Sequence, residues 1–357
     1  MRNRKSDKIT LIVCSLLLTI CLLFPSTAKA ADDEGGKFNA SEMIFGHIGD
    51  SYEWHFTNIG DKPIAIPLPI IVYSHERGEW FFFSSSRVVE GEAYNGFYIA
   101  KDGNYSGKLV EKGASGEEVR PLDISLTKNA CALLINSLLL IILVLWCARW
   151  YKKKDKTSDA PKGFVGFMEM MVSMVYEDII KANIPVHVQR YAPYLLCAFF
   201  FIFLNNLIGL IPGSANLTGN IAITLVLAFC TFLMVNLFAN KEYWKEIFWA
   251  DVPLWMKPVM AVVEFLGIFT KPIALMIRLF ANIVAGHAAL LALVSVIFIT
   301  FSISSVLGGM MTPLTVLFCI FLDFLEVLVA FIQAYVFTML SAVFIGLSQA
   351  HHHEEHN

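Results

Sequence analysis

The sequence is poor in charge, because Asp, Glu, Lys and Arg together make up only 16% of its 357 residues. An ordinary soluble protein contains about 25% of these residues. This shortage, together with a hydrophobic fraction of 56%, excludes a typical soluble globule and predicts an integral membrane protein. The net charge of −3 gives no indication of a nucleic-acid partner.

Three further absences exclude particular kinds of site or fold. The seven cysteines all lie in apolar stretches and none forms a Cys-x-x-Cys pair, so we expect neither a disulfide framework nor a metal site. No Gly-x-x-x-x-Gly-Lys-Ser/Thr loop occurs, which excludes that class of nucleotide site, and we expect no cofactor. No internal repeat is detectable, which argues against the transporter folds that are built from paired halves.

The first 30 residues are typical of a secretory signal peptide. Basic residues precede the apolar run ITLIVCSLLLTICLLF, and a small-x-small pattern ends at Ala30. The run is short and is followed by the polar stretch ADDEGG, which favours cleavage over an uncleaved first membrane helix. Under either interpretation, the chain that follows is exported.

Residues 31–125 form the long polar block of the sequence. They contain short aromatic and β-branched runs, such as WFFFSSSRVV and IAIPLPIIVYS, separated by Gly, Asp and Pro. Such runs predict a small β-rich domain. Its histidines, His47, His55 and His75, are scattered, so we expect surface or packing positions rather than a metal site or a catalytic constellation.

Residues 126–357 predict an all-α membrane domain with five membrane helices. Five Lys or Arg residues between 149 and 156 follow the first helix, and the positive-inside rule places them in the cytoplasm. The β-rich extension is then periplasmic and the C-terminus is cytoplasmic. The predicted membrane helices cover about 130–148, 192–211, 221–239, 258–300 and 313–350.

Two features of this domain depart from simple spanning helices. Residues 163–184 are apolar but are interrupted by charges such as Glu169 and Lys181, which favours an amphipathic helix on the cytoplasmic membrane surface. The last two apolar stretches are each about 40 residues long, twice the length that crosses a bilayer. These antiparallel helices must therefore tilt steeply, break or partly leave the membrane.

The fourth membrane helix carries a stripe of polar residues. Glu264, Lys271 and Arg278 are seven residues apart and share one face, with Asn282 about 40° further round. His287 follows Arg278 by nine residues and points about half a turn away, so it belongs to a different surface. An unpaired charge near the middle of a bilayer costs at least about 2.5 kcal/mol. Arginine, unlike lysine, cannot avoid that cost by losing its proton.

The last helix runs in the opposite direction, and its residues Glu326 and Gln333 share a face about 10 Å apart along the axis. Antiparallel docking places Gln333 level with Arg278 or Asn282, and Glu326 level with His287. An acid beside an imidazole is suited to proton relay, and a permanent positive charge is suited to interrupting a proton path. His287 could equally satisfy one interhelical hydrogen bond.

Other interpretations stay open from the residues alone. Arg278 could pair with Glu326 or Asp323 only to lock two helices together. Glu264 and Lys271 could form a rim pair at the cytoplasmic surface. Three asparagines in or beside the middle spans either hydrogen-bond between helices or line an aqueous cleft: Asn205, Asn206 and Asn220.

Two segments, in this order, resemble subunit a of the F-type ATP synthase, the stator channel of its Fo sector. They are KPIALMIRLFANIVAGH at 271–287 and FLEVLVAFIQAYVFTMLSAVFIG at 324–346. The first contains the motif R-L-F-x-N-x-x-A-G, from Arg278 to Gly286, and the second contains Gln333. The resemblance extends from about residue 125 to the C-terminus and does not cover the exported extension.

The resemblance implies a proton-translocating stator subunit and not an enzyme, with nucleotide chemistry on partner subunits. Implied partners are a c-subunit ring, the b-subunit peripheral stalk, other synthase subunits and the lipid of a bacterial inner membrane. By the same resemblance, Arg278 would face the ring with Asn282 and Gln333 as polar neighbours. Glu264 and Lys271 would border the cytoplasmic half-channel.

The resemblance also implies that His287 and Glu326 form the outer proton relay. The direction of the last helix places Asp323 on the same side, as a further half-channel candidate. Many bacterial members carry Glu and His in the reverse order at these two positions, and the exchange seen here resembles the mitochondrial form. Protons would enter past this pair and Asn282 and neutralise a carboxylate on a c subunit. They would leave through the cytoplasmic half-channel after almost a full turn, while Arg278 blocks direct leakage.

Two other classes of function make different predictions. An independent secondary transporter, with Arg278 binding an anionic substrate, predicts transport by the purified chain alone. A membrane scaffold or sensor, whose exported domain does the work, predicts that Arg278→Ala leaves function intact. Within the resemblance, the ion is coordinated mainly by the c subunit, and the titratable outer pair favours protons over sodium.

Overall fold

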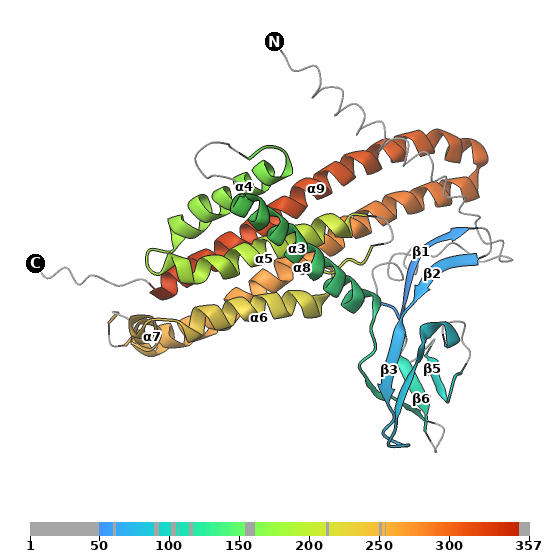
Figure 1. The fold of residues 1–357 in the computed structure, drawn as a ribbon, viewed down its shortest axis with the longest axis horizontal. Coiled ribbons are helices and arrows are strands. Elements are labelled where there is room, and N and C mark those ends of the chain that lie inside the picture. Colours follow the sequence, from blue (N-terminus) through green and yellow to red (C-terminus); the bar gives the residue numbers. More distant parts are fainter. Residues whose placement is uncertain are drawn as a thin grey trace, which may run out of the picture. The chain divides into compact units, whose positions relative to one another are not determined.

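The computed structural model of the chain describes residues 50–349, except 60–61, 89–92, 101–104, 106, 114–116, 154–160, 212–213, 250–251 and 254. The predicted signal peptide lies outside the described residues. A β-rich region comes first in the described chain, and helices follow it (Figure 1).

Among its described residues, the β-rich region contains one two-stranded hairpin and two three-stranded antiparallel sheets, with strand orders β4-β3-β8 and β5-β6-β7. The two larger sheets share a core, in which Ile70, Val72 and Phe83 meet Phe97 and Leu109. The strands are β1 (Glu53–Ile59), β2 (Lys62–Pro67), β3 (Pro69–Tyr73), β4 (Trp80–Ser84), β5 (Phe97–Ile99), β6 (Leu109–Lys112), β7 (Glu118–Val119) and β8 (Leu122–Asp123). The region is β-rich, as its short aromatic and β-branched runs predict.

Most of the remaining described chain is helical. Apolar residues with few charges build long helices because a helix satisfies its backbone groups internally, without water. The helices are α3 (Lys128–Lys153), α4 (Phe164–Met174), α5 (Val188–Gly209), α6 (Ile221–Leu237), α7 (Lys241–Phe248), α8 (Lys257–Ile303) and α9 (Ser305–Gln349). A π-helical stretch, η2 (Val175–Lys181), directly continues α4.

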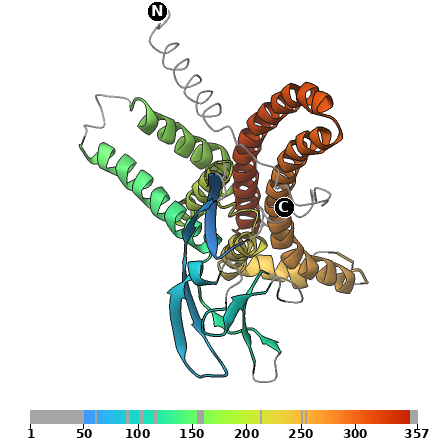
Figure 2. The ribbon, with the colours of Figure 1, turned by 90° about the vertical axis from the view of Figure 1, so that its right-hand side faces the viewer.

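The two last helices are longer than the sequence predicts. The predicted linker between them, residues 301–311, is helical except at Ser304. The uncharged residues of this segment continue both helices, and Gly308 lets α9 turn back tightly, because a Cβ there would lie 2.5 Å from the Phe301 ring. With 47 and 45 residues, α8 and α9 are each about 70 Å long, more than twice a bilayer's hydrocarbon core. They do not break within these bounds, and Figure 2 shows them as a curved pair.

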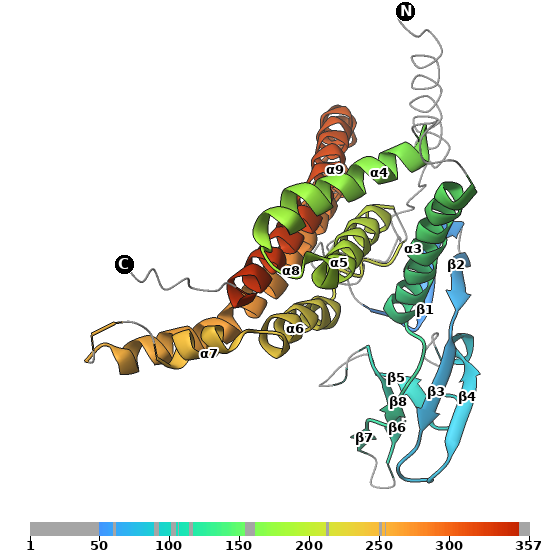
Figure 3. The ribbon, with the colours of Figure 1, turned by 60° about the vertical axis from the view of Figure 1, so that its left-hand side comes forward.

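By length and composition, four of the described helices can cross a membrane alone: α3, α5, α8 and α9. With 17 residues, α6 is about 25 Å long, shorter than the hydrocarbon core of about 30 Å. It meets α7 at 97°, and the two helices together count as a fifth candidate span. Figure 3 shows α6 and α7 beside α8. The sequence predicts a loop where α7 lies.

The helical core forms where α5 packs on α9 and α9 packs on α8. Large buried side chains meet there, including Phe199 of α5, Leu275 and Leu279 of α8, and Phe337 of α9. Helix α6 packs on α8, and α3 packs on α5. This arrangement holds α8 and α9 in a defined antiparallel register, which determines which polar residues meet.

Candidate functional site

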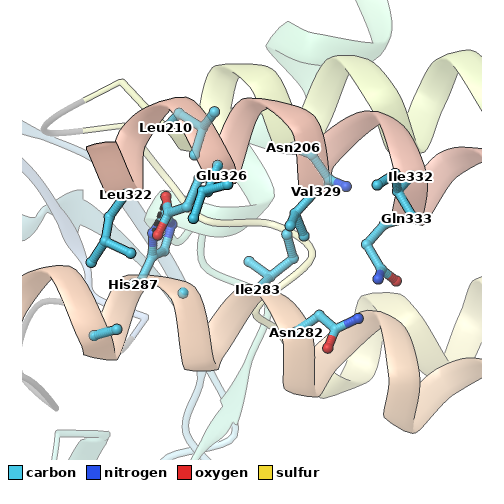
Figure 4. A pocket seen from close by; sticks show the side chains of 13 residues that line it. Asn206, Leu210, Asn282, Ile283, His287, Leu322, Glu326, Val329, Ile332 and Gln333 are labelled. Carbon is cyan, nitrogen blue, oxygen red and sulfur yellow. Dashed lines mark ion pairs between the residues drawn. The ribbon is translucent and has the colours of Figure 1, made fainter. Parts of the chain in front are cut away.

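A cavity of about 290 Å³ lies between α8 and α9, and α5 contributes to its wall. Its polar lining comes from Asn206 on α5, Asn282 and His287 on α8, and Glu326 and Gln333 on α9. Apolar side chains such as Ile283 and Val329 complete the wall. Figure 4 shows His287 and Glu326 at one end, and Asn282 and Gln333 at the other. Antiparallel docking of the two helices predicts both pairs, with Glu326 level with His287 and Gln333 level with Asn282.

His287 and Glu326 face each other across the helix pair, with Nδ1 of His287 3.6 Å from Oε2 of Glu326. Both side chains are largely buried, at 19% and 13% exposure. Neither carboxylate oxygen of Glu326 has a hydrogen-bond partner among the described residues. The carboxylate therefore has free acceptor positions beside a cavity that has room for several water molecules. An acid and an imidazole in this position can exchange a proton with each other and with such water.

The three asparagines that the sequence left undecided have three different roles. Asn205 Oδ1 accepts a 2.8 Å hydrogen bond from Asn136 on α3, so this pair joins two helices. Asn206 lines the cavity, accepts a 2.7 Å hydrogen bond from Thr218, and donates to the backbone of α9 at Ala330. Asn220 caps α6, because its side chain accepts from the Ala222 amide.

Arg278 lies on an exposed face of α8 and does not line the cavity. In the part of the chain that the structure describes, its guanidinium makes no hydrogen bond and no ion pair. Glu326 pairs with His287 instead, so the structure does not support a helix lock between Arg278 and Glu326. Asn282, one helical turn or about 6 Å further along α8, is also exposed and does line the cavity. At Asn282, the cavity therefore reaches the exposed face of α8 that carries Arg278.

Small side chains surround Arg278 on its face of α8. Ala274, Ala281 and Ala285 lie at spacings of four, three and seven residues from it, and all three are exposed. Residues at these spacings share a helix face. Another helix could therefore approach the α8 backbone closely on both sides of the guanidinium.

Lys271 and Glu264 lie towards the beginning of α8, away from the cavity. Lys271 is half-buried, its Nζ is 5.7 Å from the centre of the Phe344 ring on α9, and it lines a small cavity of about 10 Å³ with Asn236 and Tyr243. Glu264 is half-buried and interacts electrostatically with Tyr243. No ion pair joins Glu264 and Lys271 in the described structure, which argues against the rim-pair interpretation.

Asp323, a further candidate, interacts electrostatically with Glu326 and His287. It is exposed on α9 three residues before Glu326, and it does not line the cavity. Conversely, the sequence interpretation missed Asn136 and Thr218, which hold Asn205 and Asn206 in place. A signal was available, because Asn136 is a lone amide within an otherwise apolar run. No three His, Cys, Asp or Glu side chains of the described chain are grouped as a metal site.

A multi-pass helical protein with a polar, ionisable cavity between two long helices, beside an exposed arginine, has the features of an ion-conducting membrane subunit. Comparison with known proteins agrees with this class. A family model described as "ATP synthase A chain" matches residues 132–346. A second family model, "Domain of unknown function (DUF8433)", matches residues 43–125.

Curated relatives carry the same description. The chain is 44% identical to ATP synthase subunit a of Chlorobium phaeobacteroides, over 66% of this chain and 67% of the relative. It is 42% identical to that of Chloroherpeton thalassium, over 67% and 70%. It is 41% identical to that of Myxococcus xanthus, over 66% and 77%.

The chain belongs to the ATP synthase subunit a family. It is therefore a membrane subunit of an ATP synthase and not itself an enzyme, and its partners are other subunits of that complex.

Proposed function

We propose that this chain is the proton-conducting stator subunit of the synthase and that it provides two offset half-channels to a ring of c subunits. The observation that carries the proposal is the unpaired, exposed Arg278, which lies one turn from the end of the α8–α9 cavity. Family membership supports the channel role. The half-channels and the residues assigned to them are inferred from the geometry.

Arg278 separates the two half-channels. An arginine facing lipid without a partner costs at least about 2.5 kcal/mol. The alanines beside it allow a partner helix to approach, and a carboxylate on that helix would neutralise the guanidinium charge. A ring of such helices, each with one acid, supplies a fresh partner at every step of rotation. The fixed positive charge keeps that acid ionised beside it and repels protons that would otherwise cross directly.

The α8–α9 cavity is the outer half-channel. Protons reach His287 and Glu326 at one end of the cavity, and pass Asn282 and Gln333 at the other end before they reach the ring. Asn206 adds a third polar surface to this path. A proton then neutralises the ring carboxylate, which releases it from Arg278 and allows it to rotate into lipid. Asp323, exposed near the same end, is at most a peripheral member of this half-channel.

The inner half-channel begins near Lys271 and Glu264, beside Asn236 and Tyr243. The two residues lie about 10 Å and about 21 Å from Arg278 along α8, on the opposite side from His287. This separation along one helix offsets the two paths, so a proton must be carried round by the ring. The membrane potential supplies about 2.3 kcal/mol per charge per 100 mV for this cycle.

The orientation follows from the charges beside α3. Its C-terminal end leads into the cluster of Lys and Arg residues between 149 and 156, which is typical of a cytoplasmic loop. The β-rich region is then periplasmic, and the end of α9 is cytoplasmic, in a bacterial inner membrane. The b-subunit stalk is the partner that holds this chain against the rotating ring.

The test is proton pumping and ATP synthesis in membrane vesicles that contain the whole synthase. Arg278→Ala should abolish both activities, whereas the neighbouring exposed variant Ile277→Ala should retain most of them. The amount of assembled complex, measured in the same membranes, separates loss of coupling from loss of assembly. A fully active Arg278→Ala would contradict the proposal, and proton transport by the purified chain alone would favour an independent transporter.

A further inference from the structure

The sheet formed by β4, β3 and β8 has one core face and one apolar outer face. In β3 and β4, alternate residues such as Ile70, Val72 and Phe83 point into the shared core. The residues between them point outward and include Trp80 and Phe82, which are 58% and 75% exposed. We call the outward residues the apolar face: Ile71, Tyr73, Trp80, Phe82, Leu122 and Ile124.

The apolar face is continuous across the three strands. Tyr73 of β3 pairs with Trp80 of β4 on one side and with Leu122 of β8 on the other. Two residues along, Ile71 pairs with Phe82, and the Ile124 amide donates a 3.0 Å hydrogen bond to the Ile71 carbonyl. Soluble surfaces rarely keep so many large apolar side chains together without a partner.

The outer face of the other sheet is different. Its exposed positions carry Lys112 and Glu118, which are paired across β6 and β7, and the Tyr98 hydroxyl donates a 2.8 Å hydrogen bond to Glu118. The region therefore has an apolar side and a charged side, separated by one core. This arrangement suits a region that lies between an apolar surface and water.

The chain ties this region to the start of a membrane helix at two points. Ile124 and Leu122 precede Lys128, the first residue of α3, by four and six residues, so they reach at most about 14 Å and 20 Å from it. The Lys128 and Asn129 amides donate hydrogen bonds of 2.9 and 3.1 Å to the Ser51 carbonyl and to Asp50 Oδ1. The polar–apolar boundary of the bilayer, where α3 enters it, is therefore within reach.

We infer that the apolar face rests on the lipid bilayer surface at which α3 begins, so that the exported domain is held against the membrane. Its composition supports this occupant, because Trp and Tyr with aliphatic neighbours are the residues that concentrate at the headgroup level. The sheet offers a broad surface across three strands, which a bilayer can cover entirely. The inference does not depend on the half-channels, and it gives the extension a positioning role beside the membrane subunit.

The test measures the depth of single labels in the assembled synthase in vesicles. Phe82→Cys, labelled with a water-soluble maleimide of an environment-sensitive fluorophore, is exposed to lipids that carry a nitroxide close to the headgroup. Glu118→Cys on the charged side is the matched control, and Ile124→Cys gives a second position on the apolar face. The unsubstituted synthase supplies the labelling background of the native cysteines.

We expect quenching at residues 82 and 124 to be several-fold stronger than at residue 118. Equal quenching at all three positions would overturn the inference. So would a photocrosslinker at residue 82 that couples mainly to another protein subunit or to a second copy of this chain, because a protein would then cover the apolar face. If the synthase with Phe82→Cys fails to assemble, the comparison of quenching between Ile124→Cys and Glu118→Cys decides the inference alone.

Discussion

Exchanging His287 and Glu326 tests whether the pair works as an acid and an imidazole in contact, whichever helix carries which group. His287→Glu alone places two carboxyl groups where the pair now has its 3.6 Å contact, and Glu326→His alone places two imidazoles there. The double exchange restores one of each. We therefore expect both single variants to lose most of their proton-driven ATP synthesis and the double variant to regain much of it.

The geometry sets the size of this coupling. Two unit charges 3.6 Å apart interact by about 4.6 kcal/mol at an effective dielectric constant of about 20. The side chains are 19% and 13% exposed and adjoin the cavity, so water reduces this value. Contacting residues typically show coupling energies of about 0.5–3 kcal/mol. A coupling of about 1–3 kcal/mol corresponds to a restoration of about 5- to 150-fold beyond the product of the single losses.

The assay is ATP synthesis driven by an imposed proton gradient in vesicles, compared at equal amounts of assembled synthase. All four members of the cycle are measured: unsubstituted chain, two single variants and the double exchange. A double variant no better than the product of its singles would refute the pairing as a working unit. Fully active single variants would show that the pair has only a packing role.

Other consequences concern stability and pH. Gly308→Ala should destabilise the purified chain by about 1–3 kcal/mol, because its Cβ would meet the Phe301 ring at 2.5 Å. Gly309→Ala, with open space around it, should be neutral or stabilising, and equal melting temperatures for the two variants would contradict the hairpin geometry. Asn136→Leu should cost about 1–3 kcal/mol, because the side-chain oxygen of Asn205 on α5 would stay buried without a donor, and the measurement is a lower melting temperature. Burial, and then a hydrogen bond to an aspartate, raise the pKa of Tyr52. The unfolded chain therefore loses this proton first, and stability of the β-rich region should fall above about pH 10. Tyr52→Phe should reduce this loss of stability at high pH, measured by hydrogen exchange. An unchanged pH dependence would mean that another group causes the loss.

Helical periodicity made much of the membrane part predictable. The spacing of Glu326 and Gln333 on α9, and the half-turn between Arg278 and His287 on α8, follow from 3.6 residues per turn. The antiparallel direction of α8 and α9 then limits which side chains can meet. Both expected pairs line the cavity, His287 with Glu326 and Asn282 with Gln333. The β-rich region was also predictable, because short aromatic and β-branched runs separated by Gly, Asp and Pro favour strands.

Features that depend on contacts between distant segments were not predictable. The tight turn at Ser304 depends on Gly308 meeting Phe301, and an uncharged stretch gives no sign of where one helix ends. The pairing of Asn136 with Asn205 joins residues 69 positions apart. The exposure of Asp323 depends on the rotation of α9 against α8, which the spacing to Glu326 alone does not specify.

The most direct test of the central claim is a density map of the assembled synthase that resolves the Arg278 side chain. The account predicts that its guanidinium faces a carboxylate of the c ring, between the α8–α9 cavity on one side and the Lys271 cavity on the other. An Arg278 side chain against bulk lipid, or paired with an acid of this same chain, would contradict it.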